Sequence, residues 1–133
     1  MNGLPIRNEY VEIEPDPDHH VVVFRRTAAP LPESEPDLRE FYEQIAGVFD
    51  GLPLEHWGLL VDGRAPRGRN DETFERVQNE YRPRLFGRFG RVAALVRTSV
   101  GALQVDRYIK DEGESFGVFS EEDDALSFLG TRA

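Results

Sequence analysis

The distribution of apolar and polar residues along the chain predicts alternating β-strands and α-helices. Residues 9–14 alternate polar and apolar side chains, which is typical of a half-buried strand. A turn-forming segment at 15–18 separates them from residues 20–26, whose β-branched and aromatic side chains predict a second strand. We expect these two strands to form an antiparallel hairpin.

Helical periodicity follows the hairpin. A helix is predicted over 36–50, because apolar side chains recur there at three- and four-residue spacing and Ser34 lies where an N-cap is expected. Gly51 is suited to end this helix. A second helical pattern begins at Asp71, and Pro83 lies where it would kink or end that helix.

Two apolar runs, at 57–61 and 92–96, lack any alternation. Such runs predict strands that are buried on both faces, as in the centre of a parallel sheet. Residues 116–119 predict one more short strand.

Two further helices complete the pattern. One is predicted over 99–112, capped by Ser99, and the last is opened by Ser120 and closed by Gly130. The resulting order, ββαβαβαβα, predicts an α/β fold with a single mixed, mostly parallel sheet and helices packed on it. We expect one domain over 9–130, with a flexible N-terminal tail at 1–8 and a short C-terminal tail at 131–133.

The order and spacing of three segments resemble the STAS-like domains, the fold of anti-sigma factor antagonists and of the cytoplasmic tails of sulfate transporters. The resemblance is greatest to the small stand-alone bacterial STAS-like proteins related to lipid-carrier folds, and it covers roughly 9–130. It implies the STAS-like fold and a regulatory role through protein contact. The segments are Leu59-Leu60-Val61-Asp62, Arg91-Val92-Ala93-Ala94-Leu95-Val96 and Val118-Phe119-Ser120-Glu121-Glu122-Asp123-Asp124-Ala125-Leu126-Ser127-Phe128-Leu129.

One feature of that family is missing. Anti-sigma factor antagonists carry a phosphorylatable Ser or Thr just after the Asp that ends the central strand. Here Gly63, Arg64 and Ala65 follow Asp62, and the first hydroxyl is that of Thr73. The resemblance therefore does not extend to the phosphorylation switch.

The loop after the central strand is the candidate functional site. Open α/β sheets place their sites at the carboxyl ends of strands, and a helix N-terminus together with guanidinium groups can bind phosphate or carboxylate. Gly63 and Gly68 have the spacing of the glycines in a phosphate-binding loop. Such a loop requires Lys-Ser/Thr directly after the second glycine, and this chain has Arg69-Asn70 there. The predicted anion- or partner-binding residues are Asp62, Gly63, Arg64, Arg67, Gly68, Arg69 and Asn70.

A structural interpretation of the same loop stays open. Its arginines could pair with the neighbouring Asp71, Glu72 and Glu75 instead of with a partner. Asp62 could likewise cap the loop by accepting backbone N–H bonds.

Charge narrows the choice of partners. The net charge of −9 argues against binding to nucleic acid or to anionic lipid. Residues 64–91 nevertheless contain eight arginines and four acidic residues. This basic stripe would suit a negative protein surface, a phosphorylated group or the acidic end of a second copy, as in a homodimer.

Catalytic and metal-binding patterns are missing from the sequence. There is no cysteine, and no serine lies in a nucleophile motif. His19 and His20 follow Asp16 and Asp18 in a predicted surface turn, while His56 is interpreted as structural. We therefore expect no cofactor and no metal, and the absence of a membrane-spanning run or signal peptide favours the cytoplasm.

These observations predict a non-enzymatic regulatory or adaptor protein that acts by protein–protein contact through the loop after the central strand. The alternative is a carrier or sensor of a small molecule, either a lipid or an anionic metabolite. If the loop arginines are solvated, replacing Arg64, Arg67 and Arg69 together by alanine should leave the melting temperature near that of the wild type.

Overall fold

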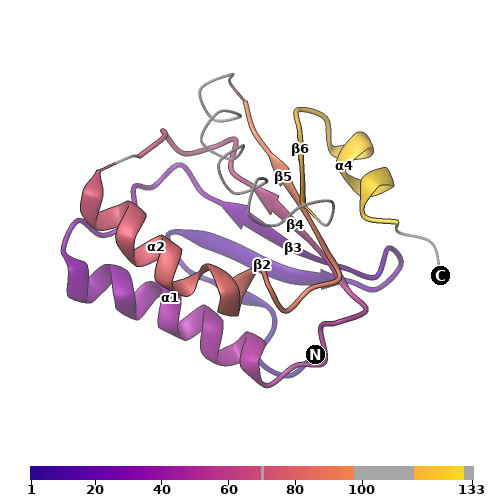
Figure 1. The fold of residues 1–133 in the computed structure, drawn as a ribbon, viewed down its shortest axis with the longest axis horizontal. Helices are drawn as coiled ribbons and strands as arrows, with labels where there is room; N and C mark the ends of the chain where they lie inside the picture. Colours follow the sequence, from indigo (N-terminus) through magenta and orange to yellow (C-terminus); the bar gives the residue numbers. More distant parts are fainter. Residues whose placement is uncertain (70, 98–115, 131–133) are drawn as a thin grey trace.

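The computed structural model describes residues 1–69, 71–97 and 116–130, and it folds them into a six-stranded sheet with helices on both faces (Figure 1). The elements in chain order are β1 (Ile6–Arg7), β2 (Val11–Asp16), β3 (Val21–Arg26), α1 (Glu35–Asp50), β4 (Gly58–Asp62), α2 (Glu72–Leu85), β5 (Arg91–Leu95), β6 (Phe116–Phe119) and α4 (Glu122–Phe128).

The strands lie in the sheet in the same order as in the chain. The pairs β1–β2 and β2–β3 are antiparallel, whereas β3, β4, β5 and β6 run parallel to one another. The predicted hairpin and the predicted mixed, mostly parallel sheet are therefore confirmed. The parallel pairs need crossover connections, which α1 and α2 supply for β3–β4 and β4–β5.

The strand β4 lies in the interior of the sheet, between β3 and β5. Its residues alternate between two separate apolar clusters. Leu59 joins the cluster that includes α1 and α2, and Leu60 joins the cluster on the opposite face. Because both faces are covered, a strand of this kind shows no alternation in sequence, and the prediction of a doubly buried strand is confirmed.

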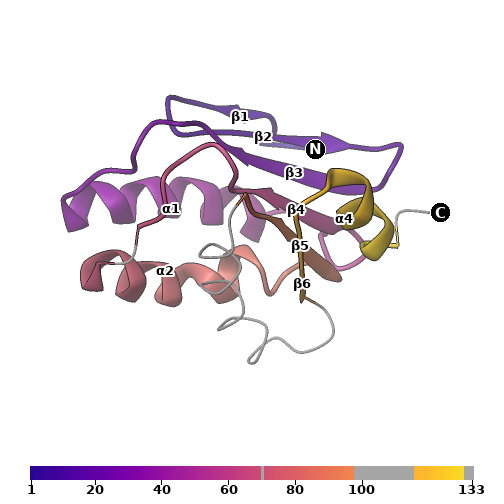
Figure 2. The ribbon, with the colours of Figure 1, turned by 90° about the horizontal axis from the view of Figure 1, so that it is seen from above.

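The helices α1 and α2 lie side by side on one face of the sheet, and α4 lies on the other (Figure 2). Ser34 caps α1 by accepting from the backbone N–H of Asp37, as predicted, and Asp71 caps α2 by accepting from that of Phe74. Pro83 lies inside α2 and does not end it, because the helix continues to Leu85.

The basic stripe of the sequence is largely neutralised within the fold. Arginines of α2 and the turn after it form ion pairs with acidic residues of α1, so that little of their charge is left for a partner. The bonds from Arg76 and then Arg39 lower the pKa of Glu35 to about 2. The pairs joining α1 to α2 and its following turn are Arg39–Glu80, Arg76–Glu35, Arg84–Glu43, Arg84–Asp50 and Arg88–Asp50.

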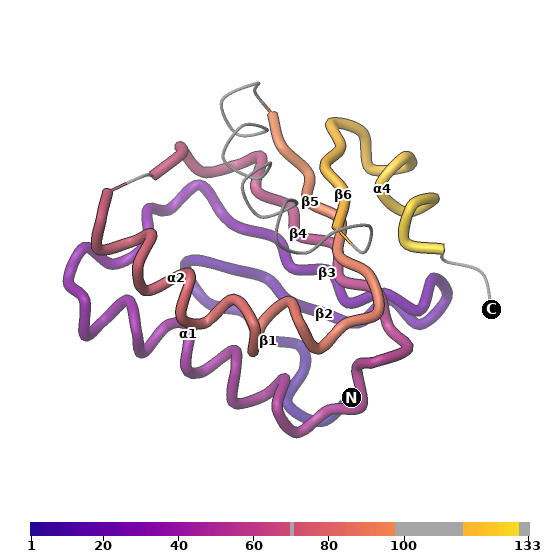
Figure 3. Tube along the Cα trace, viewed as in Figure 1, coloured from indigo at the N-terminus to yellow at the C-terminus, as the bar shows by residue number. Residues whose placement is uncertain are grey.

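The structure corrects two local predictions. Ile6 and Arg7, expected in a flexible tail, form the edge strand β1 because they pair with β2; Figure 3 traces the chain through this edge. Ser120 does not cap the last helix, whose N-cap is Glu121 without a side-chain cap bond, whereas Gly130 ends the helix with φ 65° as expected. The helix predicted over 99–112 lies outside the described residues.

No helix in the described ranges is both long and apolar enough to cross a bilayer.

Candidate functional site

Polar side chains gather at the carboxyl end of β4, where the sequence predicts a site. The parallel register sets Asp62 of β4 opposite Arg25 of β3. Nη1 of Arg25 donates to Oδ2 of Asp62 at 2.6 Å. Arg64, two residues further along the loop, donates to Asp62 through its backbone N–H at 3.2 Å and through Nε and Nη2, both at 2.9 Å.

The helix α4 contributes a second carboxylate to this cluster. Glu122 accepts from Nη2 of Arg25 at 2.9 Å and lies 3.7 Å from Nη2 of Arg64. Two guanidinium groups therefore share two carboxylates, and the four formal charges balance. We call Arg25, Asp62, Arg64 and Glu122 the edge cluster.

The two carboxylates of the edge cluster differ in exposure. The Asp62 side chain is 11% exposed, whereas that of Glu122 is 38% exposed. Burial alone would raise the pKa of Asp62, but the hydrogen bonds from Arg64 and Arg25 outweigh it, so the pKa of this carboxyl is lowered. Asp62 is thus an ionised anchor, and the interpretation that it caps the loop through the Arg64 backbone N–H is confirmed.

The three loop arginines lie in three different environments. Arg64 belongs to the edge cluster. Arg69 bonds Asp71 through Nε and Nη2, donates to the carbonyl of Pro32 at 3.0 Å and stacks over the ring of Phe74. Arg67 is exposed, and in the described part of the chain it has no carboxylate partner.

The loop therefore does not bring its three arginines together into one anion-binding pocket. Asp71 occupies the N-terminus of α2 with its own carboxylate and pairs with Arg69, which confirms the structural interpretation for this arginine. Gly63 donates its N–H to the carbonyl of Leu95, and Gly68 is exposed. Asn70 lies outside the described residues, so its predicted role stays a prediction.

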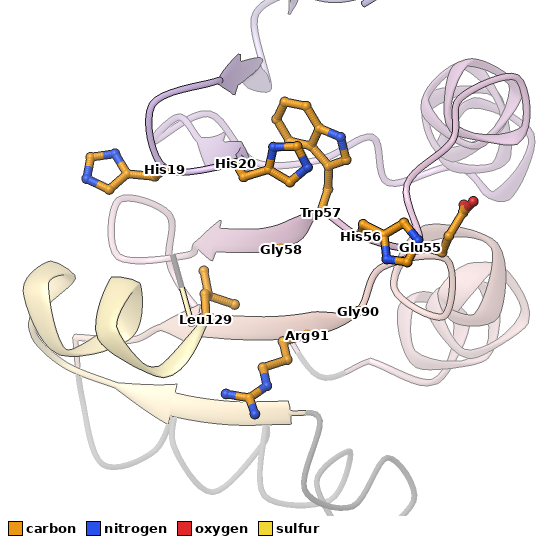
Figure 4. A pocket seen from close by; sticks show the side chains of 10 residues that line it. His19, His20, Glu55, His56, Trp57, Gly58, Gly90, Arg91 and Leu129 are labelled. Atoms are coloured by element: carbon orange, nitrogen blue, oxygen red, sulfur yellow. The ribbon is translucent and has the colours of Figure 1, made fainter. Parts of the chain in front are cut away.

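A second polar site lies at the amino end of the parallel strands, where the sequence predicts none. It is a hollow of about 330 Å³ (Figure 4). Its lining contains all three histidines of the chain and the single tryptophan. The lining residues are His19, His20, Glu55, His56, Trp57, Gly58, Gly90, Arg91, Leu129 and Gly130.

The hollow forms because two chain segments meet beside the start of β4. The carbonyl of His20 accepts from the N–H of Gly58, which places the end of the β2–β3 turn against the entry to β4. The His20 imidazole then stacks on the Trp57 indole, with ring centroids 4.0 Å apart and an interplanar angle of 21°. Asp16 bonds Nδ1 of His19 at 2.7 Å.

The sequence does not predict this hollow, because His19 and His20 are interpreted from it as a surface turn and His56 as structural. The available signal was that each histidine site lies directly before a predicted strand, and neighbouring parallel strands begin at the same edge of a sheet. Within the described residues, no group of three or more His, Asp or Glu side chains is arranged to hold a metal ion.

Comparison with known proteins identifies the fold. No protein-family model matches the chain, and no curated protein matches it. A crystal structure of an uncharacterised protein of the DUF3478 family from Shewanella loihica PV-4, described as having a SpoIIAA-like fold, superimposes with a TM-score of 0.63 at 16% identity. The match covers 93% of this chain and 98% of that one. The fold is therefore SpoIIAA-like, which confirms the expected STAS-like architecture.

Proposed function

We propose that the chain is a non-enzymatic, cytoplasmic regulatory or adaptor protein that acts by contact with another protein through the loop after β4. The supporting observation is the exposed Arg67, which has no carboxylate partner among the described residues, in the loop that also carries Arg64. The SpoIIAA-like fold adds the expectation of a regulatory role.

The chemistry of this edge favours a partner with an acidic surface or a phosphorylated group. Arg67 offers a guanidinium that has no carboxylate partner among the described residues, and such a group recognises carboxylate and phosphate oxygens well. Arg25 and Arg64 are each 37% exposed and are bound on their outer side by the half-exposed Glu122. A partner's anion can replace Glu122 on these two arginines while Asp62 stays in place beneath them.

The same geometry argues against acid–base catalysis at Asp62. A general base needs a pKa near the working pH, and the hydrogen bonds to Asp62 lower its pKa instead. All of its described polar contacts are arginine donors or a backbone N–H, which fits an anchoring role.

Quantitative affinity capture from the source cells tests this proposal. The wild type is compared with Arg67→Ala and with the matched control Arg7→Ala, which removes the same charge from an exposed pair on the far edge strand β1. We expect proteins that the wild type and Arg7→Ala both capture and that Arg67→Ala loses. Glu122→Gln should strengthen the same captures, because it removes one of the two carboxylates that pair with Arg25 and Arg64.

Identical capture by the wild type and Arg67→Ala would overturn the proposal. Equal loss in Arg7→Ala would also overturn it, because the contact would then depend on overall charge and not on the loop.

A second candidate function, a carrier or sensor of a small molecule, is favoured by the hollow at the amino end of the parallel strands. Its volume lies within the range of small-molecule sites. Native mass spectrometry of the purified protein tests this function, since a carrier should retain a small molecule of defined mass.

A further inference from the structure

The hollow at the amino end of the parallel strands offers a flat aromatic surface. The His20 ring is stacked on the Trp57 ring at an interplanar angle of 21° and is itself exposed, so the imidazole presents an aromatic face to solvent in front of the indole. Stacked aromatic side chains of this kind accept another planar group in an offset arrangement. One wall of the hollow is therefore suited to a ring.

The backbone holds His20 in an unusual conformation. Its φ is 58°, and among the described residues no other non-glycine residue has a positive φ. This region favours glycine, so the histidine is kept there by its surroundings. Its side chain contributes the stack on Trp57, which a glycine could not provide.

The opposite wall carries a positive charge. Arg91 donates Nη1 to the carbonyl of Phe128 at 2.6 Å, and its guanidinium lies 5.5 Å from the centroid of the Phe128 ring. It has no carboxylate partner within the described chain, although the protein has a net charge of −9. Its other N–H groups have no acceptor among the described residues, so they can donate to an anion.

The remaining lining residues agree with a small polar ligand. Figure 4 shows His56 and Glu55 beside the entry to β4; Gly58, the first residue of β4, and Gly90, directly before β5, also line the hollow. The His56 imidazole can donate a hydrogen bond to a bound anion. The Glu55 carboxylate, at the rim of the hollow, would repel the same anion. Leu129 is the one aliphatic side chain in the lining, which disfavours a lipid acyl chain.

We infer that this hollow binds a small aromatic carboxylate, with its ring stacked on the outer face of the exposed His20 imidazole, which Trp57 supports from behind, and its carboxylate bound by Arg91. The inference rests on the second candidate function and names its ligand class. A flat ring alone would not use the guanidinium, and a small inorganic anion would not use the stacked rings.

The single tryptophan makes the binding directly measurable, because all indole fluorescence of the chain comes from Trp57. Benzoate is the probe. We expect a saturable change in Trp57 emission with a dissociation constant of about 1 mM or lower, as is ordinary for a ligand of this size. Benzyl alcohol should bind about tenfold more weakly, because it lacks the charge. Cyclohexanecarboxylate should bind about threefold more weakly, because its ring is not flat.

Two variants test the two walls. His20→Gly removes the imidazole while suiting the observed φ, so the fold should be retained, as checked by circular dichroism and thermal unfolding. Arg91→Gln removes the charge. Each variant should weaken benzoate binding about tenfold. Arg7→Gln is the matched control, an exposed arginine on the edge strand β1, and it should bind benzoate like the wild type.

The absence of a saturable response to benzoate in the wild type would overturn the inference. So would equal binding of benzyl alcohol, or unchanged binding in folded His20→Gly and Arg91→Gln. A retained lipid in native mass spectrometry without any benzoate response would overturn the ligand class but leave the carrier function standing. Affinity capture with Arg67→Ala tests the protein-contact proposal separately.

Discussion

Arg25 and Asp62 lie opposite one another on neighbouring parallel strands, and Nη1 of the arginine is 2.6 Å from Oδ2 of the aspartate. The same arginine reaches Glu122 of α4 with its other terminal nitrogen. One side chain thereby connects β3, β4 and the helix on the far face of the sheet. The carboxyl edge of the central strand is therefore a structural junction as well as a candidate contact surface.

Removing the Asp62 carboxylate should destabilise the fold. Asp62→Ala leaves Arg25 and Arg64 with Glu122 as the one carboxylate of the described chain that lies within ion-pair distance. Because both arginines are partly exposed, the expected loss in free energy of unfolding is about 1–3 kcal/mol, less than for a fully buried pair. Urea denaturation measures it. Glu14→Ala, which removes the exposed partner of Arg7, should cause no measurable loss.

The contribution of Asp62 should depend on pH in a defined direction. Its pKa in the folded protein is below the ordinary value of 3.8, because the arginine bonds outweigh burial. The ionised form therefore stabilises the fold fully above pH 3.8, and this stabilisation is lost as the pH falls below that value through the folded pKa. The difference in free energy of unfolding between the wild type and Asp62→Asn should be constant from pH 7 to about pH 5 and shrink on further acidification. A difference that grew toward acid pH would contradict the lowered pKa.

The loop arginines should separate into structural and exposed members, which changes the expectation that all three can be replaced without cost. Arg69→Ala loses the bonds to Asp71 and Pro32 and the stacking on Phe74, and we expect a loss of about 1–2 kcal/mol in free energy of unfolding. Arg67→Ala should unfold at the wild-type temperature. Calorimetry of the two single variants provides the comparison, and equal melting temperatures would contradict it.

Replacing Gly47 and Gly87 by alanine should change the stability of the protein in opposite directions. Gly47 lies in the interior of α1 with open space where a Cβ would be added, so Gly47→Ala should stabilise the protein by about 0.5–1 kcal/mol. A Cβ at Gly87 would lie 2.7 Å from the carbonyl oxygen of Pro83, which is backbone and cannot move freely. Gly87→Ala should therefore destabilise it. Thermal unfolding of both variants measures the two signs.

The order of elements could be predicted from local patterns, because each depends on side chains near one another in the chain. The doubly buried run of β4, the Ser34 cap of α1 and the αL glycine at position 130 all have local signatures, and the structure agrees with each. The failure to predict β1 also has a local cause. The two-residue strand β1 is too short to show alternation, and it forms only because β2 presents an unpaired edge.

The sequence could not predict which arginines lack an ion-pair partner, because their partners are far away in the chain and are brought near only by the fold. The sequence by itself determined the α/β class, the central position of residues 57–61 and the arginine-rich loop at the end of that strand. Only the tertiary structure decided that Arg64 is bound to Asp62 while Arg67 is not, and that acidic residues of α1 pair with Arg76 and Arg84 of α2. It also brought His20 and Trp57, which are 37 residues apart, into one stack. Both results follow from strand register and helix packing, which set distances between residues remote in sequence that no local pattern encodes.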